Sequence, residues 1–172
     1  MIPFVVDANA IHCFQTERIT ATPGQAHDGI NAICAANCIA LDTEKICLQE
    51  WIDCAGGKFP FALSDWIGDQ IVTGKIRFFN LAPNTCRKDL TAAGLPTPDH
   101  KWVRLAIGAG AKHLVTEDID FFDPSQKKAS ASTKAQLKAS KSGPCAKHLR
   151  KTYGISVMCL AHVPDAVVEL YD

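Results

Sequence analysis

The fold is decided by the stretch Leu114-Val115-Thr116-Glu117-Asp118-Ile119-Asp120, in which an apolar run ends directly in acidic residues. A second apolar run, Val5-Val6, ends in the same way at Asp7. Runs of this length and composition are typical of buried β-strands. In an open parallel sheet, the carboxyl ends of the strands share one edge, and ligands bind there. The two runs therefore predict an α/β fold with acidic side chains gathered at one edge of its sheet.

Five apolar stretches are predicted to be strands, and helical segments separate most of them. The strands are Pro3–Val6, Cys38–Leu41, Lys75–Phe79, His113–Thr116 and Ile155–Leu160. Such alternation is typical of a three-layer α/β/α fold with a mainly parallel sheet, here of five strands. At 172 residues, of which 47% are hydrophobic, the chain is predicted to form a single domain over 1–172.

The spacing of apolar residues predicts three helices with recognisable ends. They cover Thr43–Cys54, Phe61–Thr73 and Pro98–Ala109. Asp42 or Thr43 is the expected N-cap of the first helix. Thr97 is the expected N-cap of the third, with Pro98 at its first position and its end near Gly110. Between these elements, Asn80–Pro96 is predicted to be a long loop around a short helical turn.

The net charge is zero, but the charges are unevenly distributed. Eight of the 18 basic residues lie between Gln126 and Lys151, where no acidic residue occurs, and the other ten face 18 acidic residues elsewhere. An acidic body with one basic segment suits a carboxylate site combined with contact to a polyanion. The segment at about 124–151 is predicted to be an insertion within the domain. The stretch Asp123–Pro144 is predicted to be either a mobile loop or a marginal, solvated helix.

Several protein classes are excluded by composition. No run approaches the roughly 18 apolar residues of a membrane helix. The first residues lack the charged region and cleavage site of a secretory signal, so a cytoplasmic protein is expected. The eight cysteines form no Cys-x-x-Cys pair, and the fragments Cys34-x3-Cys38 and Cys145-x2-His148 lack a second half for zinc. Because most of the cysteines have apolar neighbours, structural thiols are predicted.

Three carboxylates are expected at one edge of the predicted sheet. Asp7 and Asp118 follow strands, and Asp99 lies in the first turn of the helix that leads into the fourth strand. Carboxylate oxygens are the ligands that the hard ions Mg²⁺ and Mn²⁺ prefer. Each residue also has a structural interpretation: Asp7 as a helix cap, Asp118 as a turn residue and Asp99 as a complement to a helix dipole.

Glu50 is predicted to share the apolar face of its helix. Ile46, Cys47 and Cys54 lie three or four positions away from it. A buried carboxylate needs a cation or a hydrogen-bond donor, because an unpaired one is costly. Glu50 is therefore a candidate metal ligand, and the alternative is a salt bridge to an arginine or lysine.

Taken in order, these pieces resemble the PIN domain nucleases over roughly positions 3 to 122. The matching pieces are Val5-Val6-Asp7-Ala8-Asn9, Ile39-Ala40-Leu41-Asp42, Leu48-Gln49-Glu50-Trp51, Asp99-x5-Leu105-Ala106 and Leu114–Phe121. The resemblance implies a PIN-like fold and an endoribonuclease that uses Mg²⁺ or Mn²⁺ and leaves a 5′-phosphate and a 3′-hydroxyl. It also implies that the metal-binding and catalytic acids are Asp7, Glu50, Asp99 and Asp118. The supporting residues would be Asn9, Thr116 and Asp120.

RNA is the expected substrate, and the basic segment is expected to contact its backbone phosphates. The candidate contacts are Lys127, Lys128, Lys134 and Lys138. The alternative for this segment is a solvated loop. A homodimer and an antitoxin-type protein partner are left open. The long loop before Asp99 and the basic insertion set the chain apart from compact toxin-type members of the family.

Three rival functions are weighed against the ribonuclease. A haloacid-dehalogenase-like phosphatase would need a second Asp two residues after Asp7, and that position is Asn9. A DNA-directed, structure-specific nuclease would use a similar cluster of acids. A non-catalytic PIN-like module would bind RNA or a partner without cutting, and retention of all four acids argues against it.

Overall fold

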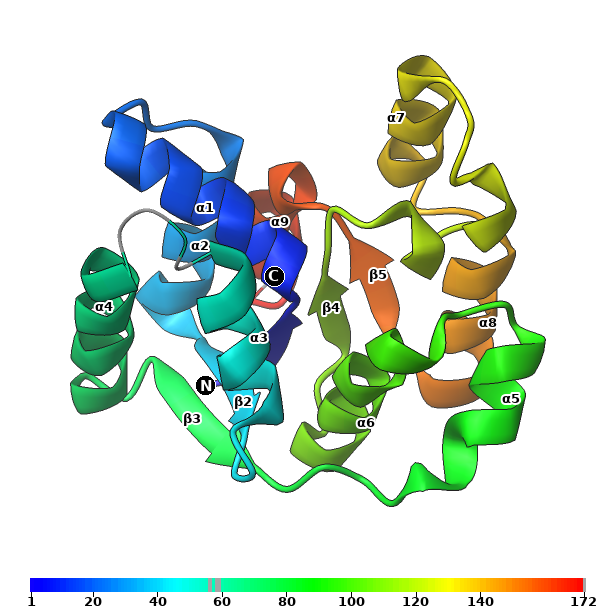
Figure 1. Ribbon diagram of the computed structural model, residues 1–172, viewed down its shortest axis with the longest axis horizontal. Helices are drawn as coiled ribbons and strands as arrows, with labels where there is room; N and C mark the ends of the chain where they lie inside the picture. Colours follow the sequence, from blue (N-terminus) through cyan, green and yellow to red (C-terminus); the bar gives the residue numbers. More distant parts are fainter. Residues whose placement is uncertain (56, 58–59, 172) are drawn as a thin grey trace.

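The computed structural model describes residues 1–55, 57 and 60–171, in which five strands form one sheet (Figure 1). The strands are β1 (Pro3–Val6), β2 (Cys38–Asp42), β3 (Ile76–Phe79), β4 (His113–Val115) and β5 (Ser156–Met158). Their order across the sheet is β3-β2-β1-β4-β5, and all neighbouring strands are parallel. The predicted α/β fold and its five strands are confirmed.

The burial of the strands explains why each of them is a continuous apolar run in the sequence. Every residue of β2 is buried, and so is every residue of β1 after Pro3. Parallel strands are covered by helices on both faces, so neither face needs polar side chains. The edge strand β3 is different, because it exposes two of its four residues.

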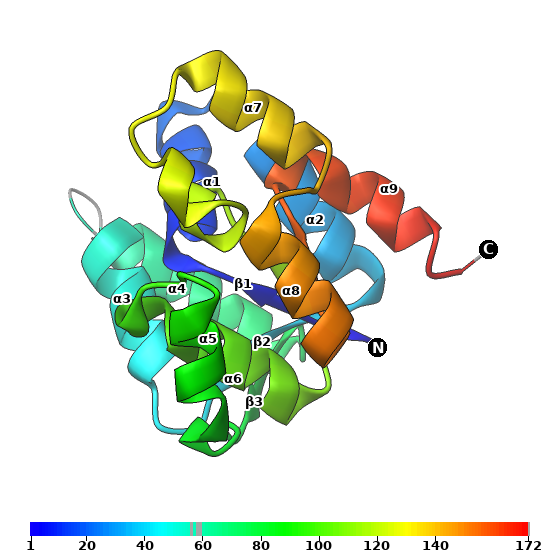
Figure 2. The same cartoon turned by 90° about the vertical axis from the view of Figure 1, so that its right-hand side faces the viewer.

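Helices flank the sheet on both sides. The longer ones are α1 (Ala8–Thr20), α2 (Gln25–Ala36), α3 (Ile46–Ala55), α4 (Pro60–Val72), α6 (His100–Ala109), α7 (Ala131–Ala139) and α8 (Pro144–Tyr153), and the shorter ones are α5 (Arg87–Ala92) and α9 (Val163–Val168). In Figure 2, α2 and α9 lie on one side of β1, and α5 and α6 lie on the other. None of the described helices is long and apolar enough to span a membrane.

The start of α3 differs from the prediction by three residues. The carboxylate of Asp42 accepts hydrogen bonds from the backbone amides of Ile46 and Cys47, both at 2.8 Å. These bonds let the chain turn at 43–45 before the helix begins. The side chain of Asp42 therefore caps the first amides of α3, although Asp42 ends β2 and does not stand directly before the helix, and Thr43 as the cap is wrong.

The predicted cap of the helix before β4 is also wrong. Thr97 is the first residue of a 3₁₀ turn, Thr97–Asp99, that runs into the helix. An N-cap residue needs an extended backbone, and a residue within a helical turn lacks it. Helix α6 starts at His100, with Asp99 immediately before it. Its end is as predicted, because Gly110 adopts the left-handed conformation with φ of 64°.

The basic segment at 124–151 divides into two parts. Helix α7 has no buried residue, so the first part is the solvated helix that the composition allowed. Helix α8 buries Cys145, Ala146 and Leu149 and packs on β5. Two parallel neighbours such as β4 and β5 need a crossover connection, and α8 provides it. The second part of the segment therefore belongs to the sheet's own framework.

The cysteines are structural or surface thiols. All eight are described and free, and five of them are buried. Among the described residues, no group of three or more potential metal ligands contains a cysteine. Cys54 departs from its apolar sequence surroundings, because it is exposed at the end of α3.

Candidate functional site

Asp7 anchors the site at the carboxyl end of β1. It is 2% exposed, and its Oδ1 accepts the Ala10 amide at 2.9 Å, so it caps α1 as well as facing the acid cluster. Its Oδ2 accepts the hydroxyl of Thr116. Burial raises the pKa of Asp7 from 3.8 to about 7, the two hydrogen bonds oppose this shift, and nearby Asp118 and Asp99 add to it. The carboxyl group is thus costly to ionise without a cation.

Three carboxylates come together beyond β4. Single oxygens of Asp99, Asp118 and Asp120 all lie within 4.8 Å of one another. Burial, followed by the charge of Asp118, raises the pKa of Asp99 to about 6, while Lys101 acts in the opposite direction. Several hard oxygen ligands converging on one point match what Mg²⁺ and Mn²⁺ require.

Hydrogen bonds fix the position of Asp118. Asn9 donates from Nδ2 to its Oδ2 at 3.3 Å, and the Asp120 amide donates to its Oδ1 at 2.9 Å. The Thr116 hydroxyl oxygen accepts the Asp118 amide at 2.9 Å while donating to Asp7. Thr116 therefore links the acid after β1 to the acid after β4. Its supporting role in catalysis stays a prediction.

Asp120 lies inside the cluster rather than beside it. Its side chain is 3% exposed, and its Oδ2 pairs with the ammonium of Lys127 at 2.9 Å. Its Oδ1 is buried and has no hydrogen-bond partner among the described residues. A buried, unsatisfied carboxylate oxygen is costly, and a bound cation would satisfy it. The residues present therefore fit a divalent metal ion.

Glu50 forms the salt bridge that was its alternative interpretation, and its role as a metal ligand stays a prediction. It is half-buried and forms an ion pair with Lys101 at the start of α6. It is not part of the described group of converging acids, although its charge raises the pKa of Asp99. Lys101 is a site residue that the sequence analysis missed. The sequence did contain an indication of its role. A lysine in the first turn of a helix interacts unfavourably with the helix dipole, so a nearby anion is expected.

A cleft of about 480 Å³ opens beside Asp118, between α1 and the segment around α7. Its lining residues are Asn9, His12, Cys13, Glu117, Asp118, Ile119, Lys127, Lys134 and Lys138. Three of the four predicted phosphate-binding lysines thus come together next to the acids, and Lys128 is not among the lining residues. His12 and Cys13 were missed, because nothing in the sequence of α1 separates them from ordinary helix residues.

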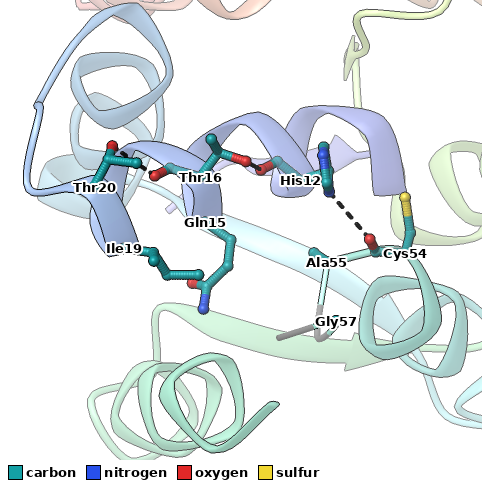
Figure 3. A pocket seen from close by; sticks show the side chains of 8 residues that line it. All are labelled: His12, Gln15, Thr16, Ile19, Thr20, Cys54, Ala55 and Gly57. Atoms are coloured by element: carbon teal, nitrogen blue, oxygen red, sulfur yellow. Dashed lines mark hydrogen bonds between the residues drawn. The ribbon is translucent and has the colours of Figure 1, made fainter. Parts of the chain in front are cut away.

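A second cavity, of about 380 Å³, lies between α1 and the end of α3 (Figure 3). Its lining residues are His12, Gln15, Thr16, Ile19, Thr20, Cys54, Ala55 and Gly57. His12 lines both hollows, and its Nδ1 lies 3.1 Å from the carbonyl oxygen of Cys54. Among the described residues that line this cavity there is no carboxylate, so these residues do not fit the metal chemistry of the acid cluster.

Comparisons with known proteins add little to this geometry. No family model and no curated protein matches the chain. Among solved structures, the chain is similar to one chain of the crystal structure of VapBC2 from Rickettsia felis bound to a DNA fragment from their promoter. The two chains are 19% identical with a TM-score of 0.47, over 70% of this chain and 91% of the other. A similarity of this size assigns the chain to no family.

Proposed function

We propose that this chain is a divalent-metal-dependent endoribonuclease, as its sequence resemblance to the PIN domain nucleases implies. One observation carries the proposal. Oxygens of Asp99, Asp118 and Asp120 lie within 4.8 Å of one another, and Asp120 keeps a buried oxygen without a described partner. Carboxylates held in this way leave coordination positions open for water and for a phosphate oxygen.

The chain's own residues have distinct roles in this proposal. Asp99, Asp118 and Asp120 would hold Mg²⁺ or Mn²⁺, and Asp7 and Glu50 would complete the acid set on either side. The bound ion would supply an activated water and stabilise the charge on the phosphate. Asn9 and Thr116 keep the carboxylates in position through the hydrogen bonds described above.

The substrate is proposed to be RNA, held by its backbone in the lysine-lined cleft. Lys127, Lys134 and Lys138 line that cleft beside Asp118. Such contacts add affinity without reading sequence. The family resemblance implies products with a 5′-phosphate and a 3′-hydroxyl.

Cleavage of a labelled single-stranded RNA tests the proposal. Purified protein should cut with Mg²⁺ or Mn²⁺ and stop with EDTA. Asp7→Asn and Asp118→Asn should each lose at least about tenfold in rate, because each removes charge that stabilises the transition state. Asp53→Asn, the same change at an exposed position of α3, is the matched control and should cut at the wild-type rate. Wild-type cutting by either site variant would remove that residue from the site.

The same assay separates the alternatives. Preferential cutting of flapped duplex DNA over RNA would favour a structure-specific DNA nuclease. Metal-dependent RNA binding without any cleavage would favour a non-catalytic module. The antitoxin-type partner and the homodimer stay predictions, and co-purification and the solution mass would test them.

A further inference from the structure

Lys127 stands between the acid cluster and the cleft. Its ammonium pairs with Asp120 Oδ2 at 2.9 Å, yet its side chain is 69% exposed and lines the cleft. The carboxylate that it holds is almost fully buried and has its other oxygen unsatisfied. Lys127 thus supplies the positive charge that a buried Asp120 needs in the absence of a metal ion.

Ion pairs leave the cleft without excess positive charge in this state. Lys127 forms an ion pair with Asp120, and Lys138 forms one with Glu117 at 3.1 Å. Among the described lining lysines this leaves Lys134, and its positive charge is matched by the negative charge of Asp118, which lines the same cleft. A phosphate would meet little net attraction here, although three lysines line the cleft.

A divalent ion at the acid cluster would change this balance. An ion bound to either oxygen of Asp120 would lie within roughly 7 Å of the Lys127 ammonium, since metal–oxygen distances are about 2 Å. Two positive charges so close repel the ammonium, and the exposed lysine is free to turn away from the acid. The ion would also neutralise Asp118.

We propose that the cleft between α1 and α7 is a subsite for the backbone phosphates of the RNA, and that Lys127 exchanges Asp120 for a phosphate when the metal ion binds. Metal occupancy would convert the cleft from a nearly neutral to a cationic surface. RNA would therefore bind more tightly to the metal-loaded protein, and by linkage the metal ion more tightly to the RNA complex. This inference rests on the proposed function, because it requires a cation at the acid cluster.

The coupling can be measured without cleavage activity. Binding of a labelled single-stranded RNA is titrated at several salt concentrations, in EDTA and in Ca²⁺, a hard cation with the same ligand preference. A gel after each titration shows whether the RNA is intact. Lys127→Met is compared with Lys128→Met, which removes the same charge from the next residue, outside the lining of the cleft. Thermal melting confirms that both variants fold.

In wild type and Lys128→Met, Ca²⁺ should raise RNA affinity and steepen its salt dependence. In Lys127→Met, the steepening should be smaller by about 0.7 in the slope of log K against log[salt], the value of one phosphate contact on a single strand. Without RNA, Lys127→Met should bind Ca²⁺ and Mn²⁺ several-fold more tightly than wild type, because the competing ammonium is gone.

The outcomes separate this inference from the proposed function. Failure of wild type to bind Ca²⁺ and Mn²⁺ in calorimetry would overturn the metal site and the exchange together. Normal metal binding, with the same Ca²⁺-dependent steepening in Lys127→Met and Lys128→Met, would overturn the exchange alone. An unchanged metal affinity in Lys127→Met would also overturn the exchange alone, since Lys127 would then not compete with the metal ion for Asp120.

Discussion

Replacing Asp7 by asparagine should stabilise the metal-free protein, and the effect should depend on pH. Burial raises the pKa of this carboxyl group from 3.8 to about 7. The folded state therefore holds a proton between these values while the unfolded state has released it. Below about pH 4 this group does not lower the free energy of unfolding. As the pH rises from there to about 7, the free energy of unfolding falls.

The size of the effect follows from the shift. A change of roughly three units corresponds to about 4 kcal/mol against folding once Asp7 is ionised at pH 8, and to about 1.6 kcal/mol at pH 5. Asp7→Asn removes this penalty but disturbs the hydrogen bond from Thr116, at a cost of about 1–1.5 kcal/mol. The variant should thus match wild type at pH 5 and exceed it by about 3 kcal/mol at pH 8. For a chain of this length, that difference is on the order of 6–12 °C in Tm.

Denaturant unfolding in EDTA at pH 5 and pH 8 measures both differences. The matched control is Asp42→Asn, which alters another buried acid at the same edge of the sheet. Both oxygens of Asp42 accept amides of α3, so this variant should lose about 1–3 kcal/mol at each pH. If Asp7→Asn also loses about 1–3 kcal/mol at pH 8, the Asp7 carboxylate stabilises the fold as a cap of α1. The argument that its burial destabilises the metal-free protein is then refuted.

Two further predictions concern the same cluster. In EDTA, Asp118→Asn should melt at or above the wild-type temperature, because the substitution removes repulsion between like charges. Millimolar Mn²⁺ should raise its melting temperature less than that of wild type, because the variant binds the ion more weakly. A loss of more than about 1 kcal/mol in its free energy of unfolding in EDTA would show that the carboxylate is needed structurally. Mn²⁺ affinity, measured by calorimetry, should fall as the pH is lowered from 8 to 5.5. Protons compete with the ion for Asp7 and Asp99, whose pKa values are about 7 and 6, so binding should also release protons. An affinity that does not change with pH would place the ion away from these two acids.

The sheet could be predicted because its signal is local. Buried parallel strands are continuous apolar runs, so all five were found within a few residues of their bounds. Asp7 and Asp118 could be placed at one edge for the same reason, since Asp7 directly follows β1 and Asp118 lies three residues beyond the end of β4. The start of α6 could not, because Thr97 and Pro98 fit a helix start as well as the 3₁₀ turn that they form.

The pairing of charges was beyond the sequence. Asp120 and Lys127 were both noted, one as a support of the acids and the other as an RNA contact, yet the structure joins them in one ion pair. Glu50 was expected to need a cation, and Lys101, 51 positions away, provides it. Both pairs depend on how α3, α6 and the segment after β4 pack together, and no local pattern encodes that packing.

These pairs explain how the metal-free fold can hold five acids so close together. Lys101 balances Glu50, Lys127 balances Asp120, and Asp7 is near its pKa at neutral pH. Asp99 and Asp118 are left without an ion-pair partner among the described residues, and their two negative charges equal the charge of one divalent ion. One ion held by Asp99, Asp118 and Asp120 would balance these two charges and displace the Lys127 ammonium from Asp120. Phosphate in the cleft would favour that step by receiving the displaced ammonium.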